Sequence, residues 1–191
     1  LKDFAVILDN VEKEYSSILI FLTNKVTKEP YLAYRKAYTD YFKVKTITDW
    51  KKVNESSDVF FICTGDNSIK QICTKISKLK PKGLVLHTSG TTPLSELKNT
   101  SKNTGVFYPL QTFTFGQSVL WQEVPVFIEA GNKKSLDYLS SLAGLFSKTV
   151  VKSNSENRLK LHLAAVIAGN FSNAMYASAY SYLDKELNKS Y

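Results

Sequence analysis

Small polar residues and glycine gather at three places where a short apolar segment ends. The apolar segments are 17–22, 58–63 and 84–87. Small residues let the backbone approach a ligand closely, and their polar atoms can bind a nucleotide cofactor. The cofactor-binding candidates are Thr23, Asn24, Lys25, Thr64, Gly65, Asp66, His87, Thr88 and Ser89. Ordinary loops use the same residue types, so each group taken alone is weak evidence for a site.

The residues after segment 17–22 also bear on which cofactor would bind. An acidic residue at this point normally binds the ribose hydroxyls of NAD, and none closes this segment. Thr23, Asn24 and Lys25 would suit a 2′-phosphate instead. The sequence therefore favours NADP, with NAD as the alternative.

A second candidate site lies in residues 105–113, which read GVFYPLQTF. An apolar strand pattern ends here in a turn whose backbone is restricted by proline. We expect the turn to place Tyr108, Gln111 and Thr112 at the mouth of a substrate pocket. The same segment also fits a packed linker between domains, which composition alone would favour.

The third candidate is a polar pair, His162 and Asn170, within the apolar helical pattern 161–179. A separation of eight residues places the two side chains about 80° apart around an α-helix, so both can face one cleft. Polar groups in such a helix are costly unless they are paired or used. An imidazole can donate a proton near neutral pH, which makes the pair our catalytic candidates. A satisfied core histidine is the alternative, and on sequence alone it is the commoner case.

The pattern of apolar segments predicts the elements that would hold these residues. Strand and helix patterns alternate before residue 109, which is typical of a parallel sheet with helices on both faces. Ligands of such sheets bind at the carboxyl edge of the strands. The expected strands are 17–22, 44–47, 58–63, 84–87 and 105–108. The expected helices are 28–41, 68–79 and one that starts at Thr92 and Pro93, and residues 4–15 fit the end of another helix. Asp66 or Asn67 would cap the helix at 68–79.

After residue 109 we expect a smaller α/β segment and then a long helix. Its elements are a strand at 124–130, a helix at 132–146 and a strand at 149–151. Ser153 and Glu156 read as a capping box for a helix that continues to about Leu187. Residues 161–179 are apolar nearly all round, so we expect this helix to be buried. Too little chain follows to cover it, which predicts further C-terminal helices, a homodimer through these helices, or both.

Composition and charge narrow the function classes. The formal charge of the 191-residue chain is +8, but nearly all of it comes from lysines that are spread along the sequence. Nucleic-acid binding proteins usually concentrate arginine and aromatic residues in one region, so we expect no nucleic-acid partner. We also expect no metal site, no membrane span and no signal peptide. Cys63 and Cys73 are expected to be reduced, which fits a cytoplasmic protein.

Three strings in this order resemble one known family: HTSG at 87–90, GVFYPLQTF at 105–113 and HLAAVIAGNF at 162–171. They are similar to the bacterial DUF2520 proteins, which join a Rossmann-like domain to a helical C-terminal domain and are related to pyrroline-5-carboxylate reductase and NADP-linked oxidoreductases. The resemblance implies a Rossmann-like domain at 1–152 and the start of an all-helical domain at 153–191. It also implies hydride transfer between nicotinamide and a small C=O or C=N substrate in the cleft between them.

The resemblance further implies roles for individual residues. His162 would donate a proton or orient the substrate, Asn170 would be its hydrogen-bonding partner, and His87, Ser89 and Gln111 would line the cleft. The family opens with a strand and a glycine-rich turn that holds the pyrophosphate, and this sequence shows neither. A truncated oxidoreductase and a non-catalytic binding or regulatory module that lost the turn are both compatible with that. A purely structural dimerisation unit is a third alternative.

Overall fold

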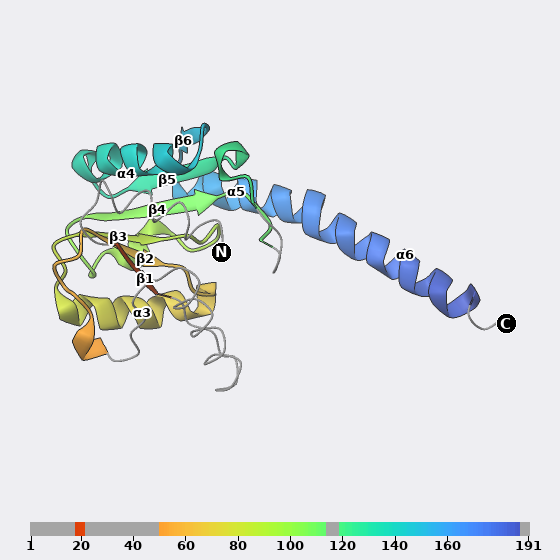
Figure 1. Ribbon diagram of the computed structural model, residues 1–191, viewed down its shortest axis with the longest axis horizontal. Coiled ribbons are helices and arrows are strands. Elements are labelled where there is room, and N and C mark those ends of the chain that lie inside the picture. Colours follow the sequence, from red (N-terminus) through yellow and green to blue (C-terminus); the bar gives the residue numbers. More distant parts are fainter. Residues whose placement is uncertain (1–17, 22–49, 114–118, 188–191) are drawn as a thin grey trace.

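The computed structural model describes residues 18–21, 50–113 and 119–187, and these form a six-stranded sheet with its strands in chain order (Figure 1). The first four strands are parallel, β5 runs antiparallel to β4, and β6 is parallel to β5. This confirms the mostly parallel sheet that strand–helix alternation predicts. The strands are β1 (Ile18–Phe21), β2 (Val59–Ile62), β3 (Leu84–His87), β4 (Thr104–Pro109), β5 (Val126–Ala130) and β6 (Val150–Lys152).

Two α-helices cover opposite faces of the sheet, α3 (Asp66–Leu79) and α4 (Lys133–Phe146) (Figure 1). Side chains of β2 alternate between them: Phe60 and Ile62 pack in the apolar cluster under α3, whereas Val59 and Phe61 pack in the cluster under α4. All four residues of β2 and all four of β3 are buried. Both faces of these central strands are covered, which fits their apolar sequences, with His87 at the end of β3 as the one polar residue among them.

Among the described residues, the α/β part also contains three short 3₁₀ helices, namely η1 (Trp50–Lys52), η2 (Leu94–Leu97) and η3 (Trp121–Glu123). The helix expected to start at Thr92 and Pro93 is only the short 3₁₀ helix η2, which begins one residue later. Its backbone bonds span three residues, from the amide of Glu96 to the carbonyl of Pro93 and from that of Lys98 to Ser95. Runs of such bonds rarely exceed four residues, so no longer helix forms here. Just before η2, the hydroxyl of Ser89 accepts hydrogen bonds from the backbone amides of Thr91 and Thr92 and forms a side-chain turn.

Both predicted helix caps differ from the structure. The residue that caps α3 is Gly65, without a side-chain hydrogen bond, and Asp66 lies inside the first turn. The capping box at Ser153 is also wrong: Asn154 caps the next helix, and its side chain accepts from the amide of Asn157. Glu156 pairs instead with Lys160, one turn further on. Asparagine is at least as good a cap as serine, so the neighbouring residue took the position.

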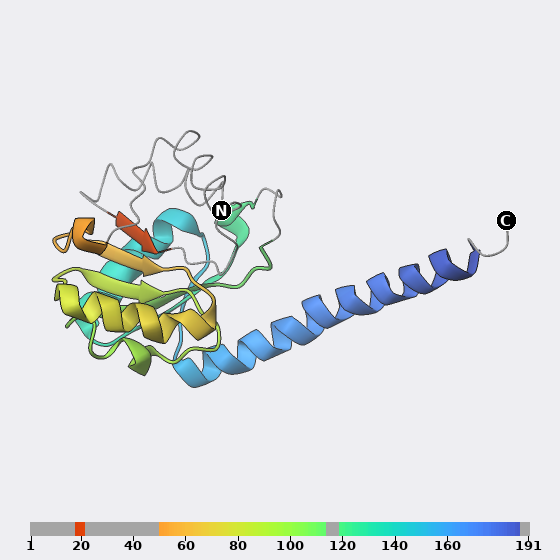
Figure 2. The same cartoon turned by 90° about the horizontal axis from the view of Figure 1, so that it is seen from below.

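The long C-terminal helix begins at residue 155 and has three parts. They are α5 (Ser155–Ala165), a π-helical segment η4 (Val166–Phe171) and α6 (Ser172–Leu187). Figures 1 and 2 show α6 projecting away from the sheet, which fits the expectation that this chain has too little material to cover the helix. Large apolar side chains along it are exposed, Met175, Tyr176 and Tyr180 among them. No described part of the chain lies over them.

Several predictions concern residues outside the described ranges. They are the helices at 4–15 and 28–41, the strand at 44–47 and the loop with Thr23, Asn24 and Lys25. Cys63 and Cys73 are free thiols. Within the described ranges, no group of histidine, cysteine and acidic residues is arranged to hold a metal ion. The helices that the structure describes are too short or too polar to cross a membrane.

Candidate active site

His87 ends β3 and is completely buried. Its Nδ1 accepts a hydrogen bond from the amide of Ser89 at 3.2 Å, so the neutral ring carries its proton on Nε2. Burial, and after it the positive charge of Arg158, lower the pKa of His87 to about 4, and the backbone of Pro93 offsets only part of their effect. His87 is therefore neutral near pH 7. Its ring is hydrogen-bonded to the loop after β3 and is closed off from solvent.

The loops after β2 and β3, two of the three predicted cofactor groups, are tied together. The hydroxyl of Thr91 donates to the carboxylate of Asp66 at 2.5 Å. A hydrogen bond also joins Thr88 to the thiol of Cys63, whose pKa is raised to about 12 by desolvation. No atom lies within 4 Å of the point where a Cβ on Gly65 would be, so the backbone there is open to close approach. Ser89 is nearly buried, and its hydroxyl serves the turn described above.

His162 of α5 lies directly on the loop after β3. A Cβ added to Gly90 would lie only 2.5 Å from Nδ1 of His162 and 2.7 Å from its Cγ, so glycine is required for this contact. The same Nδ1 is 2.9 Å from the hydroxyl of Tyr108 at the end of β4. The two rings meet edge to face, with centroids 5.9 Å apart. The imidazole on the long helix and the loop 87–90 therefore meet at the carboxyl edge of the sheet.

Asn170 faces the same segment that holds Tyr108. Its Oδ1 accepts from the hydroxyl of Thr112 at 3.3 Å, and the side chain of Gln111 accepts from the amide of Thr112. All three predicted substrate-binding residues thus lie beside the helix, with Gln111 and Thr112 exposed. The sequence predicted residues 105–113 correctly as a strand followed by a polar turn.

The π-helical segment explains how His162 and Asn170 reach one strip of the molecule. In an uninterrupted α-helix their side chains would be about 80° apart. A π-bulge adds one residue to a turn, which reduces that angle to about 20°. Both side chains then point toward residues 108–112. The sequence carried no clear signal for η4, so this alignment was missed.

Sequence reasoning also missed Arg158, which is fully buried in the first turns of α5. It forms an ion pair with Glu129 of β5 and donates to the carbonyl of Thr92 at 2.6 Å. Ser155 donates to the same carboxylate and accepts from the amide of Leu94. A signal was present, because arginine is rare in this lysine-rich chain and this one precedes His162 by one helical turn.

Tyr108 and His162 are the two side chains at this contact that can take part in proton transfer. Burial raises the pKa of Tyr108, and Arg158 offsets part of that shift, so the phenol keeps its proton at neutral pH. His162 is half-buried, and its contact with Tyr108 uses Nδ1, which leaves Nε2 for another partner. A protonated imidazole placed in this way can donate a proton to a ligand oxygen or nitrogen.

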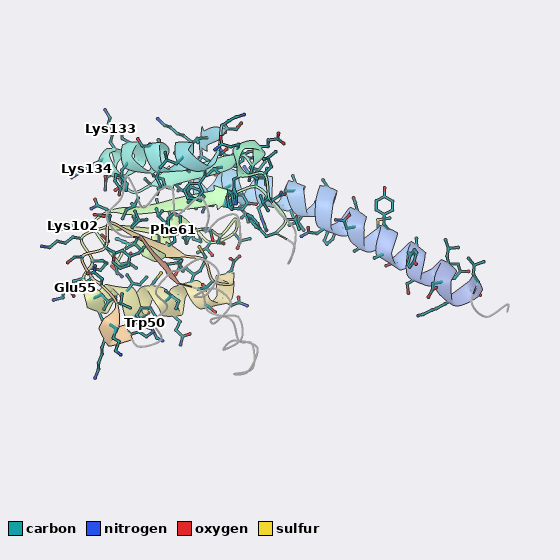
Figure 3. The ribbon with its side chains drawn as sticks, in the orientation of Figure 1. Trp50, Glu55, Phe61, Lys102, Lys133 and Lys134 are labelled. Carbon is teal, nitrogen blue, oxygen red and sulfur yellow. The ribbon has the colours of Figure 1, made fainter. Side chains whose placement is uncertain are left out.

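Much of the positive charge lies elsewhere. Figure 3 shows Lys102, Lys133 and Lys134 at the end of the sheet opposite to α5. The two residues 133 and 134 occupy the first turn of α4. The net charge of the chain therefore does not identify the candidate site, where the buried Arg158 is paired with the carboxylate of Glu129.

Known structures share this architecture. A Bacteroides fragilis protein assigned as an NADP oxidoreductase is 30% identical, with a TM-score of 0.77 over 88% of this chain. The chain spans 63% of that protein's length. A prephenate dehydrogenase from Aquifex aeolicus, solved with hydroxyphenyl propionate and NAD⁺, gives a TM-score of 0.64 at 16% identity, over 82% of this chain and 57% of its own. A pyrroline-5-carboxylate reductase from Coxiella burnetii gives 0.57 at 14% identity, over 99% and 67%.

Residues 124–189 match the family described as "Domain of unknown function (DUF2520)". This confirms the resemblance seen in the sequence, and the matched range includes His162 and Asn170. No curated protein matches the chain. The fold is therefore Rossmann-like, and its structural neighbours include a protein assigned as an NADP oxidoreductase, a dehydrogenase solved with NAD⁺ and a reductase.

Proposed function

We propose that the protein is an NADP-dependent oxidoreductase that transfers hydride between nicotinamide and a small substrate with a C=O or C=N bond. One observation carries the proposal: His162 lies on Gly90 and Tyr108 at the carboxyl edge of a Rossmann-like sheet. That edge is where open α/β sheets bind their ligands. The 30% identical protein assigned as an NADP oxidoreductase supports the same reading.

The residues at the strand ends fit the nicotinamide half of such a cofactor. The open backbone at Gly65 and the joined loops 64–66 and 88–91 offer a small polar cradle beside His162. Thr23, Asn24 and Lys25, outside the described residues, would hold the 2′-phosphate that distinguishes NADP from NAD. The bound cofactor supplies the hydride, and the protein orients the reactants and supplies the proton.

Protonated His162 would supply that proton from Nε2. As hydride adds to the substrate carbon, the proton passes to the oxygen or nitrogen of the same double bond, and neutral imidazole remains. Nδ1 keeps its hydrogen bond with Tyr108 throughout, which fixes the ring. Asn170 accepts from Thr112 through Oδ1, so its amide N–H groups are left to bind an acceptor on the substrate.

Turnover by the full-length protein tests this assignment. NADPH oxidation would be followed with a panel of imines and keto acids. We expect His162→Ala to lower kcat about 100-fold or more, as the loss of a general acid does. Lys160→Ala is the matched control, because this exposed residue lies on the same helix and pairs only with Glu156 among the residues described. Calorimetry with NADPH would show that both variants still bind the cofactor.

Two results would refute the proposal. Equal rates for the wild type and His162→Ala would remove His162 from the chemistry. NADPH binding without turnover on any substrate would favour the non-catalytic binding module.

We also propose that residues 153–191 begin a helical domain. In this proposal a second copy of the chain covers the apolar side chains of α6. Support comes from exposed apolar residues at helical spacing, namely Leu163, Ile167, Phe171, Met175, Tyr176, Tyr180, Leu183 and Leu187. Light scattering should give twice the chain mass, and a monomer at all concentrations would contradict the proposal.

The free cysteines fit the further proposal of a cytoplasmic location.

A further inference from the structure

We propose that Arg158 is a positioning residue that holds His162 in place against the loop after β3. The inference rests on the proposed function, because that function makes the position of His162 matter for proton transfer. Arg158 does not touch the reacting atoms in this account. It acts by fixing the helix and the loop that meet at His162.

The contacts of Arg158 join three elements that are far apart in the sequence. One terminal nitrogen pairs with Glu129 on β5, and the other donates to the carbonyl of Thr92 and to the hydroxyl of Ser155. Ser155 in turn donates to Glu129 at 2.9 Å and accepts from the amide of Leu94 at 3.0 Å. The start of α5 is therefore bonded both to the sheet and to the loop that follows β3.

The hydrogen bonds of Arg158 lie next to the contact between His162 and Gly90 that they would hold in place. Arg158 precedes His162 by four residues, so the two side chains leave the same side of α5 one turn apart. The loop that Arg158 holds at Thr92 is the loop that His162 touches at Gly90, two residues earlier. Because the chain between these points is short, a shift of the helix against Thr92 must also move His162 against Gly90.

The chemistry of the site calls for arginine in particular. The side chain is only 1% exposed, and a buried charge is costly unless it is paired and hydrogen-bonded. A planar guanidinium can reach a carboxylate and a carbonyl at once from two fixed nitrogens, which one ammonium group cannot do in the same geometry. Lysine at this position would keep the charge but could not bond to the carboxylate of Glu129 and the carbonyl of Thr92 in the same geometry.

Three variants of the full-length protein separate a positioning role from a general one. Arg158→Lys keeps the charge, and Ser155→Ala removes the bridge to Leu94 while leaving the ion pair in place. Lys160→Met is the matched control on the exposed side of the same helix. Each variant is measured for kcat and KM with NADPH and for the nuclear Overhauser effect between the α-protons of Gly90 and the ring of His162. The chain has only two histidines, so His87→Gln assigns their signals.

We expect Arg158→Lys to lose the Gly90–His162 cross-peak and to lower kcat about 100-fold, since small misplacements of a catalytic group have effects of this size. KM for NADPH should change less than kcat, because Arg158 holds only the loop 88–92 side of the cofactor cradle. Ser155→Ala should weaken the cross-peak and lower kcat about tenfold. Lys160→Met should leave both measurements unchanged.

The inference is overturned if folded Arg158→Lys keeps both the cross-peak and the wild-type kcat. If Arg158→Lys does not fold, Ser155→Ala decides, and an unchanged cross-peak in that variant overturns the inference. If even the wild type shows no turnover, the proposed function fails by itself. The cross-peaks then still decide whether Arg158 positions His162.

Discussion

The first and last parts of the long C-terminal helix, α5 and α6, meet their surroundings in opposite ways. α5 is bonded to the α/β part through Arg158 and His162, whereas no described residue of the chain packs over α6, which projects from it (Figure 2). α5 contributes the buried Arg158 and its polar contacts, whereas α6 carries a row of exposed apolar side chains. The comparison teaches that polar residues fix the candidate site, while the apolar face is left for another surface.

Removing the buried charge of α5 is expected to have the largest effect on stability. Arg158→Met leaves Glu129, itself only 15% exposed, without its ion-pair partner. Breaking such a pair costs about 3 kcal/mol of the free energy of unfolding. Urea titration measures the loss. Tyr180→Ala on α6, at a concentration where the chain is monomeric, should change the same quantity by less than about 0.5 kcal/mol. Equal losses in the two regions would contradict the comparison.

The second prediction concerns acid. The native pKa of His87 is about 4 and its ordinary value is 6.5, so the unfolded chain binds more protons between these two values. Stability from this residue is complete above pH 6.5 and is lost as the pH falls toward 4, at up to ~1.4 kcal/mol per pH unit. Urea titrations at about pH 7 and about pH 5 should differ by about 2 kcal/mol more in the wild type than in His87→Gln. An identical decline in both proteins would show that His87 titrates normally.

The contact between α5 and the loop gives the third prediction. Gly90→Ala puts a Cβ 2.5 Å from Nδ1 of His162, so the helix or the loop must move. Overpacking of this kind costs about 1–3 kcal/mol, and kcat should fall with it. Gly144→Ala is the matched control, because nothing lies within 4 Å of its added Cβ and alanine is the better helix former. Thermal unfolding should therefore show opposite changes, and two equal changes would argue against the contact.

The smallest effect concerns where α5 begins. Asn154→Ala removes the side chain that accepts from the amide of Asn157, which costs about 1 kcal/mol. Ser153→Ala should cost less than about 0.5 kcal/mol, because its hydroxyl caps no helix. Chemical denaturation distinguishes the two. A larger loss for Ser153→Ala would restore the capping box that the sequence predicts.

Periodicity and residue type predicted the sheet well. The buried runs at 58–63 and 84–87 and the polar turn after Tyr108 follow from local patterns. The site that they form depends on long-range contacts, such as that of Gly90 with His162, which no local pattern encodes. The resemblance to DUF2520 proteins supplied that link in advance.

Two of the differences concern how a helix begins. The segment after Pro93 forms bonds that span three residues and ends as the short η2, and Asn154 takes the cap from Ser153. The exposed apolar residues of α6 fit the expectation that this chain has too little material to cover the helix. An apolar helix indicates that something covers it, but not whether the cover lies in the same chain.

Addition of NADPH to the isotope-labelled full-length protein, followed by NMR, tests the central claim most directly. The account predicts that the amide signals of Gly65 and Gly90 and the ring signals of His162 shift together. The amides of Lys133 and Lys134, at the opposite end of the sheet (Figure 3), should stay in place. Shifts confined to the lysine end, or shifts at the sheet edge that leave His162 unaffected, would contradict a single site shared by the strand ends and α5.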